Sequence, residues 1–239
     1  MKDTEPFINA DEAQISQKEE SDIKSLIRKG FIVKVYSLLF VQLAITFGFI
    51  ALTIEIKAIS YFIVTHFILY LIAVIIPFVI LIYFICKPEK MRKVPENYIL
   101  MFIFCISIGY TSARYTIRFS KANVYLSMFL TLIAVVALTI YAYVTKQDFT
   151  MLGGLLSVFL LLLIVCLFIN IFLRIRILTL ILNIFGIILF SFYIIYDTQL
   201  IIGKHSFSLS ADDYVLAVIN LYLDIINMFL FILDLLGNK

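Results

Sequence analysis

The chain alternates between long apolar runs and short polar segments. A run of about 20 apolar residues is long enough to cross a bilayer as a helix. Seven such runs occur, and they cover Phe31–Ile54, Tyr61–Cys86, Asn97–Ala113, Val124–Thr145, Met151–Leu173, Ile177–Ile202 and Tyr214–Leu236. The segments between them are too short to fold as separate domains. The pattern therefore predicts an all-α integral membrane protein, a single seven-transmembrane-helix bundle over residues 31–236, with a kink at Pro77 in its second helix.

Residues 1–30 are polar and lack the apolar core of a signal peptide, so we expect a short tail and insertion directed by the first apolar helix. Loops rich in Lys and Arg tend to stay in the cytosol. The most basic loop is Lys87–Glu96, which carries Lys87, Lys90, Arg92 and Lys93. Two helices separate this loop from the tail, which puts both on one side. The sequence thus predicts that residues 1–30 form a cytosolic N-terminal tail.

Composition narrows the class of protein further. Hydrophobic residues make up 63% of the chain and charged residues 15%, against roughly 45–50% and about 25% in an average globular domain. So much apolar surface must face lipid, which excludes a soluble enzyme, a disordered chain and a secreted disulfide scaffold. The net charge of +3 is small and scattered, so we expect no nucleic-acid partner. Cys86, Cys105 and Cys166 stand in apolar runs without a metal-binding spacing, and we expect them to be buried.

The seventh apolar run carries a polar stripe. Asp224 lies near its middle, with Asn220 four residues before it and Asn227 three residues after, so all three share one helix face. Asp213 extends the same stripe towards the preceding loop. An Asp at the centre of a membrane helix costs about 2.5–3.5 kcal/mol on insertion scales. This face must therefore meet protein or water, which predicts that the seventh helix is central in the bundle.

The sixth run has a comparable stripe that includes Asn183, Tyr193 and Asp197. On straight helices, the depths of Asp197 and Asp224 differ by roughly 8 Å. A tilt or a local break in a helix would bring the two carboxyl groups together. The alternative is that each Asp remains separate and forms a hydrogen bond to a neighbouring helix. Adjacent carboxylates in a low dielectric cannot both ionise cheaply, so a pair would share a proton and could receive a divalent cation. We therefore expect Asp197 and Asp224 to form a proton-linked cation gate, supported by Asn220, Asn227, Asp213 and Tyr193.

Four segments resemble the Bax-inhibitor-motif family of membrane proteins. The most specific are Phe192–Gln199, which reads FYIIYDTQ, and Asn220–Asn227, which reads NLYLDIIN. Ile27–Tyr36, followed by Gln42, and Thr145–Thr150 also fit. The likeness covers about residues 25–236. The segment LSADDY that ends at Tyr214 is most similar to the Lifeguard branch, with the Golgi anti-apoptotic branch close behind.

The resemblance implies a seven-helix bundle with a central last helix, a calcium or cation leak from Golgi or endoplasmic reticulum stores, and inhibition of apoptosis. It implies that Asp197 and Asp224 are the family's two sensor aspartates, where Ca²⁺ binds only in transit. Some members latch the first aspartate with an Arg at the cytosolic end of the second helix, where this chain offers Lys87. The expected partners are the lipid bilayer, calcium ions and apoptosis-regulating membrane proteins, with no cofactor.

Other functions stay open at this stage. A non-conducting membrane scaffold that inhibits cell-death signalling fits the same resemblance. An intramembrane aspartyl protease also pairs membrane aspartates, one of them in a Tyr-Asp like Tyr196-Asp197, but its second follows Gly-x-Gly, whereas Asp224 follows Leu-Tyr-Leu. A receptor or a retinal protein is disfavoured because the seventh run has neither an NPxxY motif nor a Lys. We therefore expect that the protein is not an enzyme. The length of Tyr214–Leu236 favours a full crossing of the membrane over a re-entrant segment.

Overall fold

The computed structural model describes residues 10–237, and the side chains from residue 17 onward; residues 1–9 of the predicted tail lie outside this range. The described chain is helical, and seven of its helices are long and apolar enough to cross a membrane, as predicted. In chain order the helices are α1 (Ala10–Glu55), α2 (Lys57–Thr65), α3 (Phe67–Cys86), α4 (Glu89–Arg92), α5 (Glu96–Thr116), α6 (Lys121–Val144), α7 (Gly153–Leu173), α8 (Arg176–Ile202) and α9 (Tyr214–Gly237). Short 3-10 turns at Thr150–Leu152 and Ala211–Asp213 precede α7 and α9.

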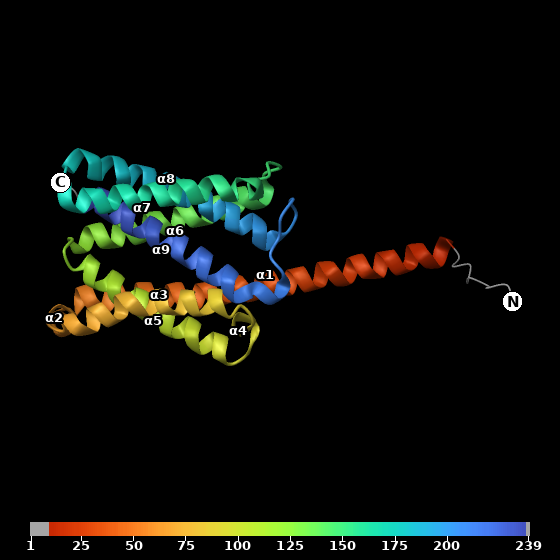
Figure 1. The fold of residues 1–239 in the computed structure, drawn as a ribbon, viewed down its shortest axis with the longest axis horizontal. Helices are drawn as coiled ribbons and strands as arrows, with labels where there is room; N and C mark the ends of the chain where they lie inside the picture. The colour runs from red at the N-terminus through yellow and green to blue at the C-terminus, as the bar shows by residue number, and fades with distance from the viewer. Residues whose placement is uncertain (1–9, 238–239) are drawn as a thin grey trace.

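Helix α1 begins 21 residues before the predicted start at Phe31, so part of the expected tail is helical. Figure 1 shows this extension projecting from the bundle. Residues 17–29 contain no Gly or Pro. Many of them, such as the Lys and Glu residues, form helices readily. An ion pair from Lys24 to Glu20, with 2.6 Å between Nζ and Oε1, supports the turn. Because a packed helix already follows, extending it needs no new nucleus.

The prediction of one continuous helix over Tyr61–Cys86 is wrong, because the structure divides this segment at His66. The backbone of His66 leaves the helical region, with φ −92° and ψ 72°. Its ring Nδ1 lies 2.9 Å from the carbonyl oxygen of Phe62, and the Thr65 hydroxyl donates to Tyr61. Such side-chain bonds to nearby carbonyls compete with the helix ladder. Pro77 lies buried within α3.

Helix α9 occupies the centre of the bundle, as the polar stripe predicts. It packs against α1, α5, α6 and α8, and it is the most buried of the seven candidate spans in the described range. In Figure 1 it runs diagonally between one half that contains α1, α3 and α5 and another that contains α7 and α8. The cysteine expectation holds only for Cys105, which is buried; Cys86 is exposed and Cys166 half-buried on helices whose outer faces are apolar.

Three contacts join the loops at the end of the bundle near the α1 extension. Arg92 pairs with Asp213, with 2.8 Å between Nη2 and Oδ1. The backbone N–H of Ser206 donates to Asp148, and Arg28 donates to the carbonyl of Leu209. The α1 extension, the Lys87–Glu96 loop and the α8–α9 loop therefore share one end, as the charge pattern predicts. At the opposite end Lys121 pairs with Glu55.

Candidate functional site

The carboxyl groups of Asp197 on α8 and Asp224 on α9 meet inside the bundle. Each carboxyl interacts with the other, both line one cavity, and their residues are only 4% and 6% exposed. Straight, untilted helices would place these two carboxyls at different depths. They meet because α9 crosses the bundle diagonally (Figure 1). Gly186 permits the close approach of α8 and α9, since a Cβ there would lie 2.8 Å from the Phe231 ring. Tilt and a small residue thus bring together two carboxyls 27 positions apart.

The pair is not fully satisfied by the protein. The Oδ2 atom of Asp224 is buried and has no hydrogen-bond donor among the described residues. A buried polar atom without a partner is costly, so this oxygen favours a proton or a cation. No Lys, Arg or His forms an ion pair with either carboxylate in the range 17–237. The arrangement therefore suits a shared proton that a cation can replace.

A cavity of about 570 Å³ opens beside the two aspartates. Three predicted supporting residues line it, namely Tyr193, Asn220 and Asn227. Asn227 also donates to the carbonyl of Leu223 at 2.8 Å. Helix α7 contributes Gly153 and Ser157 to the opposite wall, and α3 contributes Phe78. The cavity is therefore built by helices from both halves of the bundle around α9.

The lining of the cavity does not offer the ligand set of a stable Ca²⁺ site. Ca²⁺ takes six to eight oxygen ligands in a stable site. Within the described part of the chain, no cluster of three or more His, Cys, Asp or Glu side chains could hold a metal. Asp197 and Asp224 supply the charge, and the amides of Asn220 and Asn227 supply further oxygens at the cavity wall.

Two predicted site residues lie elsewhere. Asp213 stands in the 3-10 turn before α9, where its Oδ1 accepts from Nε and Nη2 of Arg92 at 3.0 and 2.8 Å. Asp213 belongs to the loops and not to the cavity. It precedes the first residue of α9, so the helical spacing that aligns Asn220, Asp224 and Asn227 does not extend to it. Lys87 is exposed after α3, with its Nζ 5.8 Å from the Tyr83 ring centre. Among the described contacts none joins Lys87 to Asp197, so the structure does not form the expected latch.

Other residues close the end of α8 next to Asp197. The Tyr36 hydroxyl of α1 donates to Thr198 at 3.4 Å. Gln199, which is fully buried, accepts from the N–H of Phe149 at 2.8 Å and donates to the carbonyl of Gln147 at 2.9 Å. Two of the segments that carry the family resemblance, Thr145–Thr150 and Phe192–Gln199, are thus in direct contact. Sequence reasoning recognised both segments without finding the bonds between them.

A second carboxylate on α9, which is half-buried, was missed. Asp234 accepts from the Tyr115 hydroxyl of α5 at 2.8 Å and from Asn183 Nδ2 of α8 at 2.7 Å. Asn183, which the sequence grouped with Asp197, therefore serves this other carboxylate. The signal was present, because Asp234 continues the seven-residue spacing of Asn220 and Asn227. Asp234 ties α5, α8 and α9 together at the end opposite the α1 extension.

Comparisons with known proteins agree with the motifs. Residues 28–239 match the family described as "Inhibitor of apoptosis-promoting Bax1" (Bax1-I). The chain is 29% identical to Protein lifeguard 3 of Mus musculus and 30% identical to Protein lifeguard 3 of Homo sapiens, in each case over 217 residues that cover 89% of this chain and 70% of the relative. It is 34% identical to Protein LIFEGUARD 2 of Arabidopsis thaliana over 206 residues, which is 82% of each chain. The resemblance to the Bax-inhibitor family and its Lifeguard branch is confirmed.

Proposed function

The chain belongs to the family of inhibitors of apoptosis-promoting Bax1, and on that premise we propose that it opposes cell death as a proton-sensitive calcium leak. The observation that carries the proposal is the contact between Asp197 and Asp224 inside the bundle, with one buried oxygen of Asp224 unpartnered. A membrane protein accepts the cost of two buried acids mainly at functional positions. When the pair holds a proton it carries less negative charge and attracts a cation less strongly.

A series of cavities supports a route through the protein. The cavity beside the aspartates shares Phe78, Leu223 and Asn227 with a second cavity of about 310 Å³ between α3, α5 and α9. The second shares Thr111 with a third, of about 510 Å³, at the end opposite the α1 extension. At the other end of the route, hydrogen bonds of Gln199 and Tyr36 hold the last turns of α8 against the neighbouring segments. The arrangement corresponds to a leak that is shut at the end near the α1 extension.

The setting of this leak is part of the proposal. We place the protein in Golgi or endoplasmic reticulum membranes, with the α1 extension and the Lys87–Glu96 loop in the cytosol. Calcium stored on the far side would enter at the third cavity and reach the aspartates. Membrane proteins that regulate apoptosis are the natural partners, and a lower store content would reduce the calcium available to trigger death.

Calcium efflux from proteoliposomes, measured as the pH is varied, tests the proposal. Asp197→Asn and Asp224→Asn should each shift the pH midpoint by about one unit or more, because either change removes the repulsion between the two acids. The double variant should not show the sum of the two shifts. Asp213→Asn is the matched control, since that carboxylate pairs with Arg92 outside the cavity. Wild-type pH profiles in both single variants would contradict the gate.

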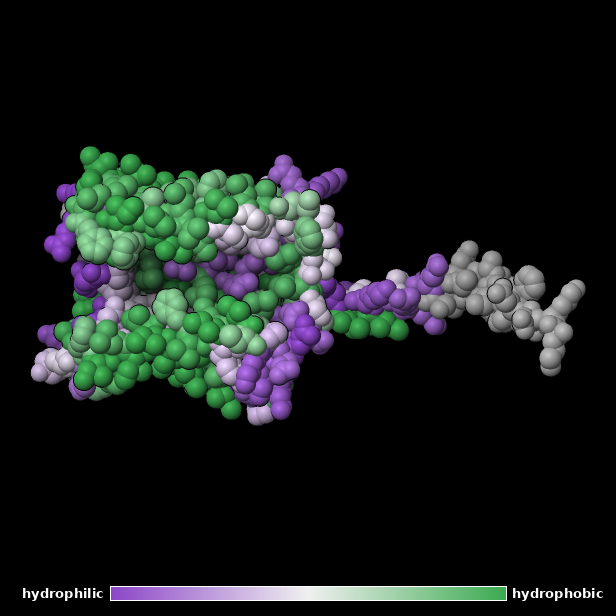
Figure 2. Space-filling model, viewed as in Figure 1, coloured by the Kyte–Doolittle hydropathy of each residue, from purple (hydrophilic) through white to green (hydrophobic). Residues whose placement is uncertain are grey.

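A non-conducting scaffold is the alternative that one observation favours. The α1 extension carries the exposed apolar residues Ile23, Leu26 and Ile27, and Figure 2 shows an apolar strip beside hydrophilic residues along it. Such a face is suited to binding a partner helix. A variant with Ile23, Leu26 and Ile27 changed to Ser separates the two functions. Loss of protection against cell death with calcium efflux intact would favour the scaffold.

The carboxyl pair also fits an intramembrane aspartyl protease, because such enzymes use two aspartates that share a proton. A peptide-cleavage assay in the same liposomes separates this function from a leak. Cleavage that is lost in Asp224→Asn, without calcium flux in the wild type, would favour the protease.

A further inference from the structure

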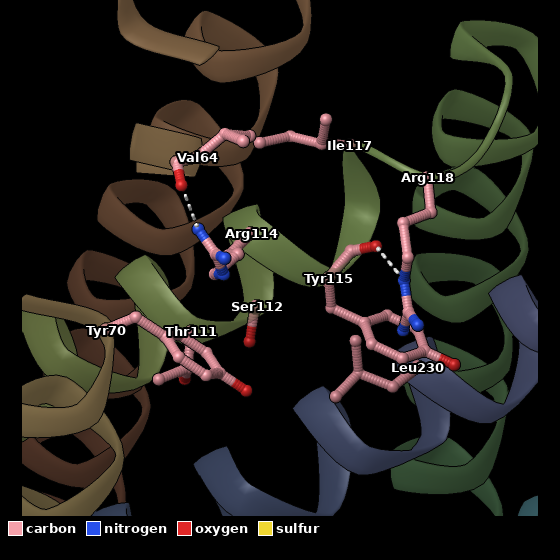
Figure 3. Close-up of a pocket in the computed structure, with 9 residues that line it drawn as sticks. All are labelled: Val64, Tyr70, Thr111, Ser112, Arg114, Tyr115, Ile117, Arg118 and Leu230. Atoms are coloured by element: carbon pink, nitrogen blue, oxygen red, sulfur yellow. Dashed lines mark hydrogen bonds between the residues drawn. The ribbon is translucent and has the colours of Figure 1, made fainter. Parts of the chain in front are cut away.

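The third cavity lies at the end of the bundle opposite the α1 extension and is lined by two arginines. Figure 3 shows Arg114, near the end of α5, and Arg118, just after it, on either side of the cavity. Its volume is about 510 Å³, and no acidic residue lines it. Neither arginine forms an ion pair with a carboxylate in the range 17–237. Two positive charges therefore face one space without a compensating anion.

Arg114 is held in position by its hydrogen bonds, and Arg118, which is exposed, is oriented by weaker contacts. Arg114 Nη1 donates to the carbonyl oxygens of Ile63 and Val64, and the group lies 4.8 Å from the Tyr70 ring centre. Arg118 Nε donates to the carbonyl of Tyr115, and its guanidinium lies 4.2 Å from the ring centre of the same residue. A guanidinium that is already oriented loses little entropy when it binds an anion. Each arginine keeps N–H groups that these contacts do not use.

The Ser112 hydroxyl adds a hydrogen-bond donor to the wall of the cavity. Ser112 lines the cavity, and none of the hydrogen bonds among the described residues involves its hydroxyl. Figure 3 shows this hydroxyl pointing into the space between the Tyr70 side and Leu230. An acceptor such as a phosphate oxygen would satisfy it together with the two arginines.

An apolar groove continues from this polar end. The adjoining cavity is lined mostly by apolar residues of α3 and α5, including Ala73, Pro77, Phe78 and Phe104. Figure 2 shows the molecule hollowed between the half that contains α3 and α5 and the half that contains α7 and α8, with apolar surface on both sides. Those surfaces face lipid in a bilayer, so an acyl chain can enter the hollow from the side. Arg114 lies near the end of its membrane span, at the level of lipid headgroups.

We propose that this end of the groove binds one membrane phospholipid. Its phosphate lies between Arg114 and Arg118 and accepts from Ser112, and one acyl chain runs along the groove towards Phe78. Basic pockets between membrane helices recognise phosphate headgroups by this combination of charge and depth. The binding follows from the cavity alone. A further consequence, that the acyl chain occupies the calcium route, rests on the proposed function.

The experiment uses the absence of tryptophan from the sequence. Phe78→Trp places a single fluorophore at the exposed wall of the groove, and Phe168→Trp places one on the outer surface of α7, away from the groove, as the control. Purified protein in mild detergent is titrated with phosphatidylglycerol that carries a brominated acyl chain, which quenches nearby tryptophan. Quenching of the Phe78→Trp protein should saturate near one lipid per chain, and quenching of the Phe168→Trp protein should rise without saturation.

Arg118→Gln in the Phe78→Trp protein tests the headgroup contact. A hydrogen bond to a charged group contributes about 1.5–3 kcal/mol, so the half-saturating lipid concentration should rise about tenfold or more. Arg118 is exposed, and circular dichroism with size-exclusion chromatography verifies that the variant folds. Lys57→Gln removes an exposed positive charge from the same end of the bundle and should leave the titration unchanged.

Several results would overturn the proposal. One is saturation at the same lipid concentration in the Phe78→Trp protein with and without Arg118→Gln. Another is equal quenching by a brominated diacylglycerol, which has no phosphate. Full competition by millimolar inorganic phosphate, with no lipid retained, would indicate a site for free phosphate instead. Saturable lipid binding in a protein that shows no calcium efflux would support the lipid site and contradict the proposed leak.

Discussion

Arg28 of α1 donates a hydrogen bond to the carbonyl oxygen of Leu209, 181 residues later in the chain, with 2.8 Å between Nη1 and the oxygen. The same nitrogen lies 3.3 Å from the carbonyl oxygen of Ile201 in the last turn of α8. A positive charge at the end of a helix complements the helix dipole and satisfies free carbonyls. One residue of the predicted tail thus fastens α1 to the end of α8 that carries Asp197.

This contact predicts that Gly203→Ala destabilises the protein. Gly203 ends α8 with φ +69°, and a Cβ there would lie 2.6 Å from Cζ of Arg28. The left-handed conformation alone costs a residue with a Cβ about 1–2 kcal/mol, and displacement of Arg28 adds to that cost. Thermal unfolding in detergent measures the change. Gly154→Ala is the control, because it has open space and lies inside α7, where Ala should be equal or better.

Asp148 predicts a pH dependence of stability at the loop end of the bundle. Hydrogen bonds from Ser206 and Thr150 hold the pKa of Asp148 well below its usual range. Since the folded pKa lies below the unfolded one, this stabilisation is present above about pH 4 and is lost as the pH falls further. The melting temperature of the wild type should therefore fall more steeply below about pH 4 than that of Asp148→Asn.

Asp212→Asn supplies the comparison for this prediction. Asp212 lies in the same loop region, but its carboxylate accepts no hydrogen bond among the described residues. Its substitution should leave the acid limb of the stability curve as in the wild type. An unchanged acid limb in Asp148→Asn would show that the loop contacts do not stabilise the fold.

The Asp234 network predicts a second set of stability changes. Asn183→Ala or Tyr115→Phe removes one donor from a carboxylate that lies between α5, α8 and α9. Each change should cost about 1–3 kcal/mol of unfolding free energy, because Asp234 loses a partner in a partly buried place. The two changes should not be additive, since they share one carboxylate. Tyr125→Phe, which removes an exposed bond to Glu55, should cost less than about 1 kcal/mol.

The sequence was sufficient for the parts of the fold that depend on solvent preference. The apolar runs identify the membrane helices because hydrocarbon requires long apolar segments. The Asn220, Asp224 and Asn227 stripe places α9 in the centre because lipid does not solvate those groups. The break at His66 was not predictable in this way. It depends on side-chain bonds at Thr65 and His66 and on Arg114 of another helix, which binds the carbonyls at the end of α2.

The candidate site was predictable in its residue types and not in its geometry. Asp197 and Asp224 are conspicuous because acids are rare in apolar helices. Their contact depends on how α9 crosses α8, which the spacing along either helix does not define. Asp213 was misplaced for a related reason, because it sits in a 3-10 turn where helical spacing no longer applies. Arg114 and Arg118 give no such signal in the sequence, because the cavity between them exists only after α5 and α9 pack.

The crossing of α8 and α9 gives a final prediction. Gly186 faces the ring of Phe231, and Gly186→Ala would place a methyl group 2.8 Å from three of its ring atoms. Because Phe231 also packs on Phe190, with ring centres 5.8 Å apart, the ring cannot withdraw freely and the helices must separate. We expect a loss of about 1–3 kcal/mol in unfolding free energy from this overpacking. The separation should also weaken the contact between Asp197 and Asp224.

A compensating change makes this prediction specific. Phe231→Leu shortens the opposing side chain, so Gly186→Ala in that background should cost less than it does alone. In calcium-efflux measurements, Gly186→Ala alone should change the pH profile in the same direction as Asp197→Asn, because both reduce the coupling between the two carboxyls. Adding Phe231→Leu should move the profile back towards the wild type. A pH profile that is unaffected by Gly186→Ala, in a protein whose stability has fallen, would show that the close approach at Gly186 supports the fold without positioning the carboxyl pair.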